Sequence, residues 1–269
     1  MATNGDRTMA RAGAAARPLA AGVVAALAAI LMACGGGSSE PPPPPPGAIP
    51  AGQAIGSATI AGRAVFQGTP PERRVIKMFG EAACRPHGDG ALGEELIVNP
   101  DGSLRNVLVH VVGGLGDRVF AAPAAPAVMD QAGCIFIPHV LAVQASQVVT
   151  FTSSDPVVHN VRAVTDANPV FNVSMPGRGR SVRRFFPNPD LVKIRCDIHA
   201  WMSAYVAVEA TPFFAVTGDG GTFELTGLPA GTFEVEAWHE TLGASRQTVT
   251  LEEGGRRVVE FVLAAAGAR

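Results

Sequence analysis

Short apolar runs recur along this chain, and turn-forming residues separate them. From residue 57 onward, runs rich in Val, Ile, Phe and Thr alternate with clusters of Gly, Pro, Asn and Asp. Runs of this length, bounded by turn residues, are typical of β-strands. The same part of the chain shows no apolar spacing of the kind that an amphipathic helix needs, so we expect an all-β protein.

The expected strands fall into an early pair, a middle series and a late series. Many short strands at regular intervals favour β-sandwiches. The residue ranges are 57–66 and 104–112 for the pair; 139–145, 148–153, 159–164, 171–175, 181–186, 191–196 and 204–210 for the middle series; and 213–217, 222–225, 232–238, 246–251 and 257–263 for the late series.

Residues 1–34 have the pattern of an export signal. Three arginines precede an apolar run over residues 19–32, which is too short to span a bilayer comfortably. The run ends in Leu31-Met32-Ala33-Cys34, which resembles the lipobox of bacterial lipoproteins. That resemblance implies acylation of Cys34 and a lipid anchor at the outer membrane, facing the periplasm or the cell surface. The alternative is an ordinary signal peptide with an incidental cysteine.

Residues 35–56 are rich in Gly, Ser and Pro, and they include an unbroken proline run over residues 41–46. Glycine and serine make a linker flexible, whereas consecutive prolines make it stiff. We therefore expect this segment to act as a tether between the anchor and the folded part.

A sequence motif in the late series of expected strands resembles that of a known β-sandwich family. Residues 218–225 read Gly-Asp-Gly-Gly-Thr-Phe-Glu-Leu, and residues 228–233 read Leu-Pro-Ala-Gly-Thr-Phe. These resemble the carboxypeptidase regulatory-like, or transthyretin-like, β-sandwich, whose first two strands here lie at the other end of the chain. We expect residues 57–115 and 211–265 to form that sandwich, with residues 116–210 inserted as a second domain. The alternative is three consecutive units.

The strongest chemical signal is the spacing Cys-x2-His-x2-Met over residues 196–202. The chain contains only 4 Cys, 6 His and 7 Met among 269 residues, so this spacing is rare by chance. The motif lies between two expected strands, and His159 opens another strand upstream. Thiolate and thioether favour Cu(I), imidazole accepts both copper oxidation states, and a His2Cys set with a distant Met suits either state.

Residues 128–210 resemble a plastocyanin-type cupredoxin, with a short ligand loop similar to that of amicyanin. The resemblance implies a Greek-key β-sandwich with one type 1 copper ion as cofactor. It assigns the trigonal ligands to His159, Cys196 and His199 and the weak axial ligand to Met202. It also implies that Asn160 ties the two ligand loops together. Asp197 departs from the family, which usually has Thr or Ser after the ligand Cys, and we expect its carboxylate to lower the potential.

Other chemistries fit the sequence less well. The net charge of −2 gives no indication of nucleic acid as a partner. A multicopper oxidase needs His-x-His pairs, which the sequence lacks, and a binuclear copper site needs a cysteine where Val192 stands. Met is a poor zinc ligand. The structural alternative is a buried free cysteine beside a core histidine.

The cupredoxin resemblance implies single-electron transfer to a redox partner protein. Because four protein ligands leave no open coordination position, we expect a carrier and not an enzyme. The expected exit is the edge of His199, with docking at Ala200 and Trp201 or on the arginine patch over residues 178–184. The alternatives are a copper store or chaperone, and a surface binding module with structural copper.

Two cysteines then remain, Cys84 and Cys134. Both can be oxidised in the compartments to which exported proteins are sent. We expect a disulfide between these two cysteines, with Cys134 in the first strand of the inserted domain. The competing hypothesis is a zinc site formed by Cys84, His87, Cys134 and His139. A place for His139 near the copper is a further alternative.

Overall fold

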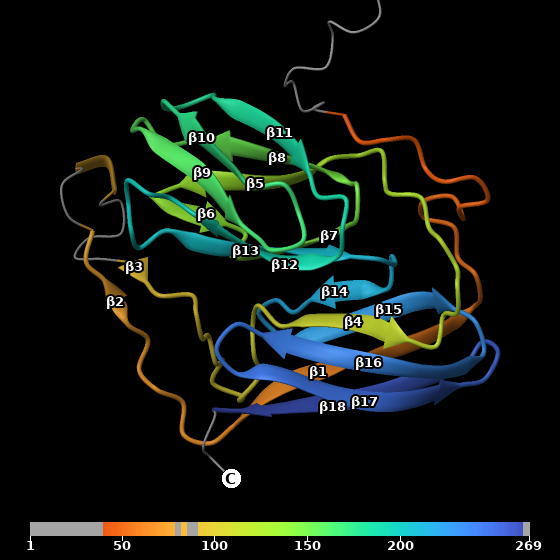
Figure 1. Ribbon diagram of the computed structural model, residues 1–269. Helices are drawn as coiled ribbons and strands as arrows, with labels where there is room; N and C mark the ends of the chain where they lie inside the picture. Colours follow the sequence, from red (N-terminus) through yellow and green to blue (C-terminus); the bar gives the residue numbers. More distant parts are fainter. Residues whose placement is uncertain (1–39, 79–81, 85–90, 266–269) are drawn as a thin grey trace, which may run out of the picture. The chain divides into compact units, whose positions relative to one another are not determined.

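The computed structural model describes residues 40–78, 82–84 and 91–265. Those residues confirm the all-β prediction, since their strands build two β-sandwiches (Figure 1). The 3-10 turn Ala82–Cys84 is the single helical element in the described ranges, which therefore hold no helix that could cross a membrane. Cys34 and the rest of the predicted export signal lie outside these ranges, as does His87.

The first sandwich, called the inner sandwich below, holds the Cys-x2-His-x2-Met motif. One sheet has the order β10-β9-β12-β13-β7, and the other has the order β11-β8-β5-β6. Its strands are β5 (Ala127–Ala132), β6 (Ile135–Ile137), β7 (Val140–Gln144), β8 (Val148–Ser153), β9 (His159–Val164), β10 (Phe171–Met175), β11 (Ser181–Phe185), β12 (Asp190–Arg195) and β13 (Ser203–Glu209).

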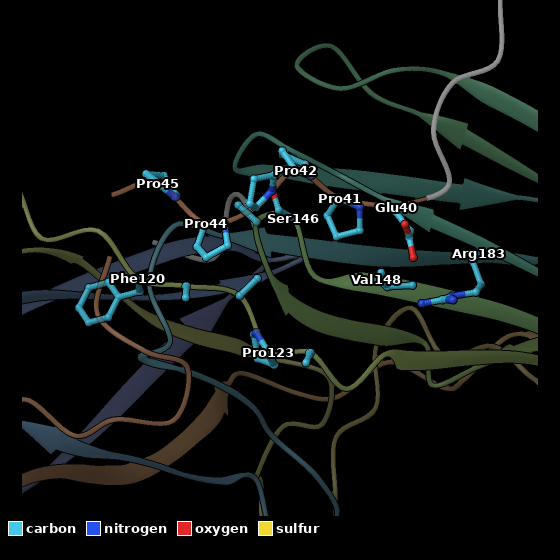
Figure 2. A pocket seen from close by; sticks show the side chains of 15 residues that line it. Glu40, Pro41, Pro42, Pro44, Pro45, Phe120, Pro123, Ser146, Val148 and Arg183 are labelled. Carbon is cyan, nitrogen blue, oxygen red and sulfur yellow. The ribbon is translucent and has the colours of Figure 1, made fainter. Parts of the chain in front are cut away.

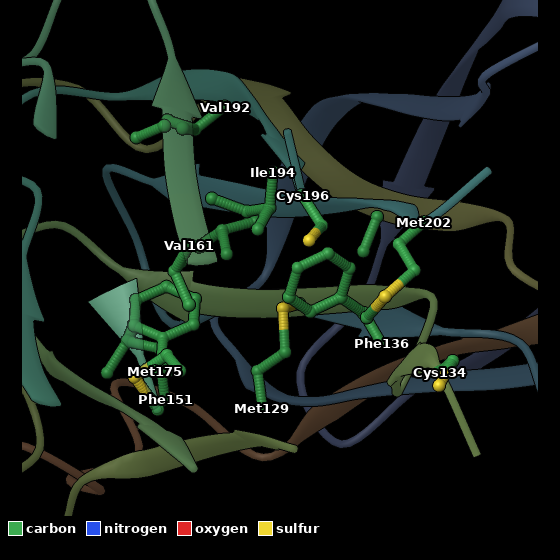
Figure 3. Close-up of a cluster of buried hydrophobic side chains, with 14 of the residues drawn as sticks. Met129, Cys134, Phe136, Phe151, Val161, Met175, Val192, Ile194, Cys196 and Met202 are labelled. Atoms are coloured by element: carbon green, nitrogen blue, oxygen red, sulfur yellow. The ribbon is translucent and has the colours of Figure 1, made fainter. Parts of the chain in front are cut away.

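Alternation of side chains builds the core of the inner sandwich. In β12, Val192 and Ile194 are buried, whereas Leu191 and Arg195 are exposed, as the period of two of a strand requires. Inward-facing residues from both sheets form one cluster, which includes Cys196 and Met202 (Figure 3). Two residues of the metal motif are therefore part of the hydrophobic core.

The second sandwich, called the outer sandwich below, has its own core. Its sheets have the orders β15-β1-β18 and β14-β4-β16-β17. Strands that precede and follow the inner sandwich in the chain therefore share the same two sheets. These strands are β1 (Ala58–Gln67), β4 (Leu108–Gly113), β14 (Phe214–Val216), β15 (Thr222–Leu228), β16 (Gly231–His239), β17 (Gly243–Leu251) and β18 (Arg256–Ala264).

The connection from β1 to β4 leaves the outer sandwich and covers part of the inner one. It contains the short antiparallel pair β2 (Val75–Ile76) and β3 (Ala91–Leu92). Four of its residues are buried in the core of the inner sandwich: Ile76, Met78, Cys84 and Ala91. This excursion brings Cys84 to a domain that begins more than forty residues later in the sequence.

Residues 40–56, part of the predicted tether, pack against the folded body. The Ile49 N–H donates to Val119 O at 2.8 Å, and the Ala121 N–H donates to Ile49 O at 2.8 Å. Prolines 41–45 line a groove of about 430 Å³ together with residues 120–124 and Arg183 (Figure 2). None of the predicted metal ligands lines this groove. The proline run is therefore part of the surface of the folded body and not a free spacer.

A half-buried charged cluster joins the two sandwiches. His110 of β4 contacts Glu209 of β13 through Nδ1 at 2.6 Å and Glu236 of β16 through Nε2 at 3.2 Å. Burial lowers the pKa of His110, but the hydrogen bonds and charges of the two glutamates raise it by more, so its pKa is raised overall. The cluster is therefore stabilised when the imidazole is protonated.

We expect the contribution of this cluster to stability to be lost at alkaline pH. The folded pKa of His110 lies above its unfolded value of about 6.5, so the contribution is complete below that pH and disappears as pH rises through the folded pKa. His110→Gln should remove this pH dependence and lower the free energy of unfolding by about 1–3 kcal/mol at pH 6.5.

Denaturant titrations of wild type and His110→Gln between pH 6.5 and pH 9 measure the effect. This range avoids His239, whose pKa is lowered by burial to about 4 and whose contribution to stability is lost on the acid side. A difference between the two proteins that stays constant over the range would contradict the prediction.

Candidate metal centre

The sheet topology brings the predicted ligands together. Strands β9 and β12 are antiparallel neighbours with Arg195 opposite Arg162, so the start of β9 lies beside the end of β12. His159 is the first residue of β9, and Cys196 directly follows β12. A tight loop then returns the chain to β13: the Met202 N–H donates to His199 O at 2.9 Å, and the Cys196 N–H donates to Met202 O at 3.3 Å.

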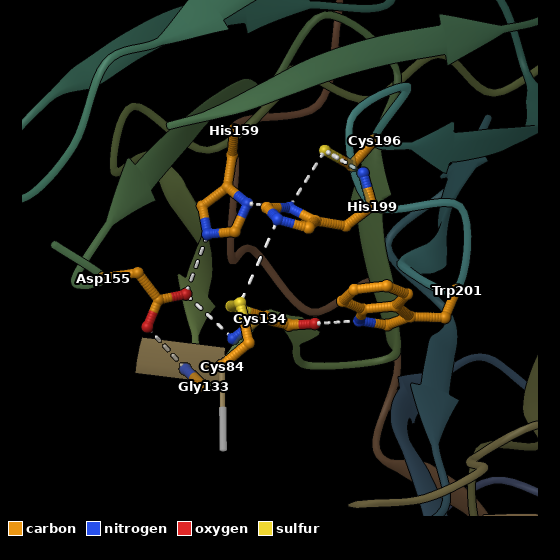
Figure 4. Close-up of a disulfide and its surroundings, with 8 residues drawn as sticks. All are labelled: Cys84, Gly133, Cys134, Asp155, His159, Cys196, His199 and Trp201. Carbon is orange, nitrogen blue, oxygen red and sulfur yellow. Dashed lines mark hydrogen bonds and ion pairs between the residues drawn. A yellow bond between two sulfur atoms is a disulfide. The ribbon is translucent and has the colours of Figure 1, made fainter. Parts of the chain in front are cut away.

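Three donor atoms converge in the interior at this point. One atom each from His159, Cys196 and His199 lies within 4.8 Å of the others, and all three residues are buried. The two Nδ1 atoms are 2.9 Å apart, and Cys196 Sγ lies 3.9 Å from His199 Nδ1 (Figure 4). Two imidazole nitrogens and one sulfur thus face a common point that water does not reach.

Met202 is buried in the same cluster as Cys196, with Phe136 and Met129 close by (Figure 3). Its side chain is 1% exposed. The loop hydrogen bonds hold its backbone against Cys196 and His199. The fourth predicted ligand therefore lies in the apolar core next to Cys196, where its thioether would be shielded from water.

The surroundings of Cys196 favour its thiolate. Burial raises the pKa of the thiol, but hydrogen bonds from His159 and from the backbone N–H groups of Asn160, His199 and Ile198 lower it by more. The Cys196 pKa is therefore lowered overall. Since the thiolate is the form of cysteine that binds metals, the lowered pKa favours metal binding by Cys196 Sγ.

Asn160 connects the two ligand-bearing loops. Its Oδ1 accepts a hydrogen bond from the Asp197 N–H at 2.6 Å, and its Nδ2 donates to Asn172 Oδ1 at 2.6 Å. The Asp197 carboxylate accepts hydrogen bonds from Asn172 at 2.7 Å and Arg162 at 3.3 Å. That side chain is 42% exposed, so its charge is paired at the surface. Asn172 had no role in the sequence-based hypothesis.

Cys84 and Cys134 form a disulfide, and it covers His199. The Cys84 Sγ lies 3.9 Å from His199 Nε2, and the Trp201 indole N–H donates to Cys134 O at 3.0 Å (Figure 4). His199 is only 4% exposed. The expectation of a solvent-exposed His199 edge is therefore wrong, because the excursion from the outer sandwich packs over it.

The structure also differs from the other roles predicted for Cys84, Cys134 and His139. Cys134 lies in the turn between β5 and β6, not within a strand. Both of the cysteine sulfurs of the competing zinc hypothesis are used in the disulfide. His139 instead pairs with Glu240 and lines a cavity of about 220 Å³ that also touches Trp201 and Met202. His139 is thus near the site without belonging to its donor set.

Two surface features remain available for a partner. Ala200 and Ile198 of the ligand loop are exposed, whereas Trp201 is half-buried. In the arginine patch, Arg178, Arg180 and Arg183 are exposed, and Arg184 lies over the Phe171 ring at 5.2 Å. Of these residues, Ala200, Trp201 and the arginine patch are the positions at which the sequence predicted docking.

Asp155 is a buried polar residue of this site for which the sequence pattern predicted no role. Its carboxylate contacts His159 Nε2 at 2.9 Å (Figure 4). The available signal was an acidic residue in the turn Ser153-Ser154-Asp155-Pro156, directly before a predicted ligand. A turn of this composition is common without any site, so the pattern alone could not distinguish the two cases.

The donor set fits a copper ion. Two buried imidazole nitrogens, a thiol with lowered pKa and a nearby thioether make the soft and borderline set that copper favours, whereas a set with Met suits zinc poorly.

Comparison with solved structures finds cupredoxins at low structural similarity over about a third of the chain. A copper-containing nitrite reductase from Thermus scotoductus SA-01 is 22% identical with a TM-score of 0.31, covering 38% of this chain but only 25% of its own. A purple cupredoxin from Nitrosopumilus maritimus is 22% identical with a TM-score of 0.28, covering 31% of this chain and 99% of its own. An oxidised amicyanin variant is 21% identical with a TM-score of 0.30, covering 38% and 98%.

No protein-family model matches the chain, and no curated protein matches its sequence. None of the structural matches named above is described as transthyretin-like, so that resemblance of the outer sandwich stays a prediction.

Proposed function

We propose that this protein is a one-electron carrier that holds one copper ion in a type 1 site. The observation that carries the proposal is the burial of two imidazole nitrogens and one thiol around a common point, with Met202 in the same loop. A copper ion bound there would supply reversible exchange of one electron between Cu(I) and Cu(II).

The residues of the chain have three tasks in this proposal. His159, Cys196 and His199 would bind the metal, and Met202 would be the weak axial ligand. Asn160 keeps the two ligand loops at a fixed separation through its bond to Asp197. The packed core around Cys196 and Met202 excludes water, so the ligands need not rearrange when the metal changes charge. With four protein ligands and no vacant position, we propose a carrier without enzymatic activity.

A redox partner protein would dock at Ala200 and Trp201 or at the arginine patch. We also propose that Cys34 anchors the protein to the outer membrane, a proposal that rests on residues 1–34 alone. Loss of membrane association in a Cys34→Ser variant would support this location, and its retention would contradict it.

One observation favours a second candidate, a copper store or chaperone. His199 is covered by the disulfide, so the usual edge for electron exit does not reach solvent. A site closed in this way retains a metal well, and retention is what a store needs.

Voltammetry of the copper-loaded, full-length protein distinguishes the two candidates. An electron carrier should show a reversible one-electron couple together with an intense visible absorption from thiolate-to-copper charge transfer. An intense absorption without a reversible couple would favour the store. A colourless Cu(II) adduct would contradict both the type 1 site and the electron-transfer proposal.

A further inference from the structure

A buried carboxylate holds the outer nitrogen of one predicted ligand. Asp155 is 5% exposed, and its Oδ2 lies 2.9 Å from His159 Nε2. The same carboxylate accepts hydrogen bonds from the Gly133 N–H at 2.7 Å and from the Cys134 N–H at 2.8 Å (Figure 4). One side chain thus connects a predicted metal ligand to the turn that carries the disulfide.

The direction of the bond to His159 decides which imidazole nitrogen is free. A carboxylate oxygen only accepts hydrogen bonds, so Nε2 must carry the proton that it donates to Asp155. With Nε2 protonated, loss of the Nδ1 proton leaves Nδ1 a lone pair for a metal, whereas in the metal-free protein Nδ1 also hydrogen-bonds with Cys196. That Nδ1 is the atom that faces His199 Nδ1 at 2.9 Å, within the predicted donor set.

The backbone fixes the carboxylate in place. Gly133 and Cys134 form the two-residue loop between Ala132 and Ile135, and both have left-handed φ angles, 66° and 58°. Such a turn presents its two N–H groups to one side, where the carboxylate binds them. The disulfide ties Cys134 to the excursion of the outer sandwich. Asp155 therefore cannot turn away from His159 without leaving the N–H groups of Gly133 and Cys134 unpaired, and the second of these is buried.

We propose that Asp155 is a positioning residue that holds His159 in its metal-binding tautomer. The inference rests on the proposed copper site for its consequence, but the hydrogen bond from His159 Nε2–H to Asp155 is itself a property of the metal-free protein. Groups that bind the outer nitrogen of a ligating histidine orient the ring, and removing them typically costs about 10- to 100-fold in metal affinity.

Asp155→Asn is the sharpest variant. Its amide oxygen still accepts from the Gly133 N–H, but its NH2 group takes the place of Oδ2, so it no longer accepts from Cys134 and favours an unprotonated Nε2. His159 should then keep its proton on Nδ1, which blocks the donor atom, as in catalytic triads in which an Asn replaces the Asp. We expect about 10- to 100-fold weaker copper binding in a competition titration with a chelator. We also expect ¹⁵N NMR of the metal-free protein to show that His159 loses its Nε2–H signal in Asp155→Asn.

The matched control is Asp130→Asn. Asp130 is a carboxylate on β5 that accepts hydrogen bonds from Thr152 and Ser154 hydroxyls, and no imidazole is among these partners. It should change neither the copper affinity nor the tautomer of His159.

Each outcome is decisive for the inference. An Asp155→Asn protein that keeps both wild-type affinity and the Nε2–H tautomer would overturn it. If Asp155→Asn does not fold, the wild-type ¹⁵N spectrum still decides, since the absence of an Nε2–H signal for His159 would contradict the inference and its presence would support it. If the wild type binds no copper, the proposed function fails, while the tautomer change in the metal-free protein still tests the role of Asp155.

Discussion

Cys196→Ser is expected to abolish the visible absorption of the copper-loaded protein completely. The absorption of a type 1 site arises from charge transfer between a thiolate and Cu(II), and Cys196 is the one free cysteine among the described residues. Serine has nearly the same shape, but its hydroxyl is a hard donor that does not ionise in this pH range. The fold should survive, because the change removes no large apolar group from the core.

Met202→Leu is the matched control for this experiment. Leucine fills a similar volume, and the three remaining ligands should keep a coloured site with a shifted potential, since the axial ligand is weak. The measurement is the visible spectrum of both variants after loading with one equivalent of copper. A Cys196→Ser protein with the wild-type absorption would show that another residue supplies the sulfur.

The second large effect is expected from Cys84→Ser combined with Cys134→Ser. The disulfide closes a loop with a sequence separation of 50. For this length the chain-entropy model gives about 4 kcal/mol of stability, an upper value because serine hydroxyls and relaxation offset part of the loss. Denaturant titration of the metal-free double variant against wild type measures the difference. Equal unfolding midpoints would show that the bridge contributes nothing to stability.

The same double variant should also lose copper faster. Without the bridge, nothing covalent holds Cys84 over His199 Nε2, so solvent and chelators gain access to that ligand. The rate of copper removal by a chelator should therefore be higher for the double variant than for wild type. It is measured without denaturant, where the variant is still folded. Asp130→Asn serves again as the control, since Asp130 is neither in the disulfide nor in the donor set. An unchanged rate of removal would mean that the disulfide stabilises the fold without sealing the site.

The strand prediction succeeded where one face of a strand is buried and the other is exposed to solvent. The predicted range 148–153 matches β8 (Val148–Ser153), and the predicted range 159–164 matches β9 (His159–Val164). The hairpin β5–β6 was missed because its pattern is ambiguous. The sequence of β5 includes Asp130 and Gln131, and the side chain of Gln131 is buried with its NH2 group donating to Asn160 O.

The sequence by itself determined the fold class and proposed the donor set. Three of the four proposed ligands lie within seven residues, between two strands that the pattern identifies, so local geometry is enough to group Cys196, His199 and Met202. The order of His159 before that motif then supported the same site through its resemblance to cupredoxins. Residue types and short-range spacing carry this information directly.

Only the tertiary structure decided how the site is enclosed and supported. Cys84 covers His199 because a connection of the outer sandwich packs on the inner one, and no local pattern specifies that contact. Asp155 gains its role because the Gly133–Cys134 turn offers two N–H groups at the place where His159 begins β9. Glu209 reaches His110 across the two sandwiches for the same reason. Such contacts join residues far apart in the chain, so they exist only once both sheets have packed.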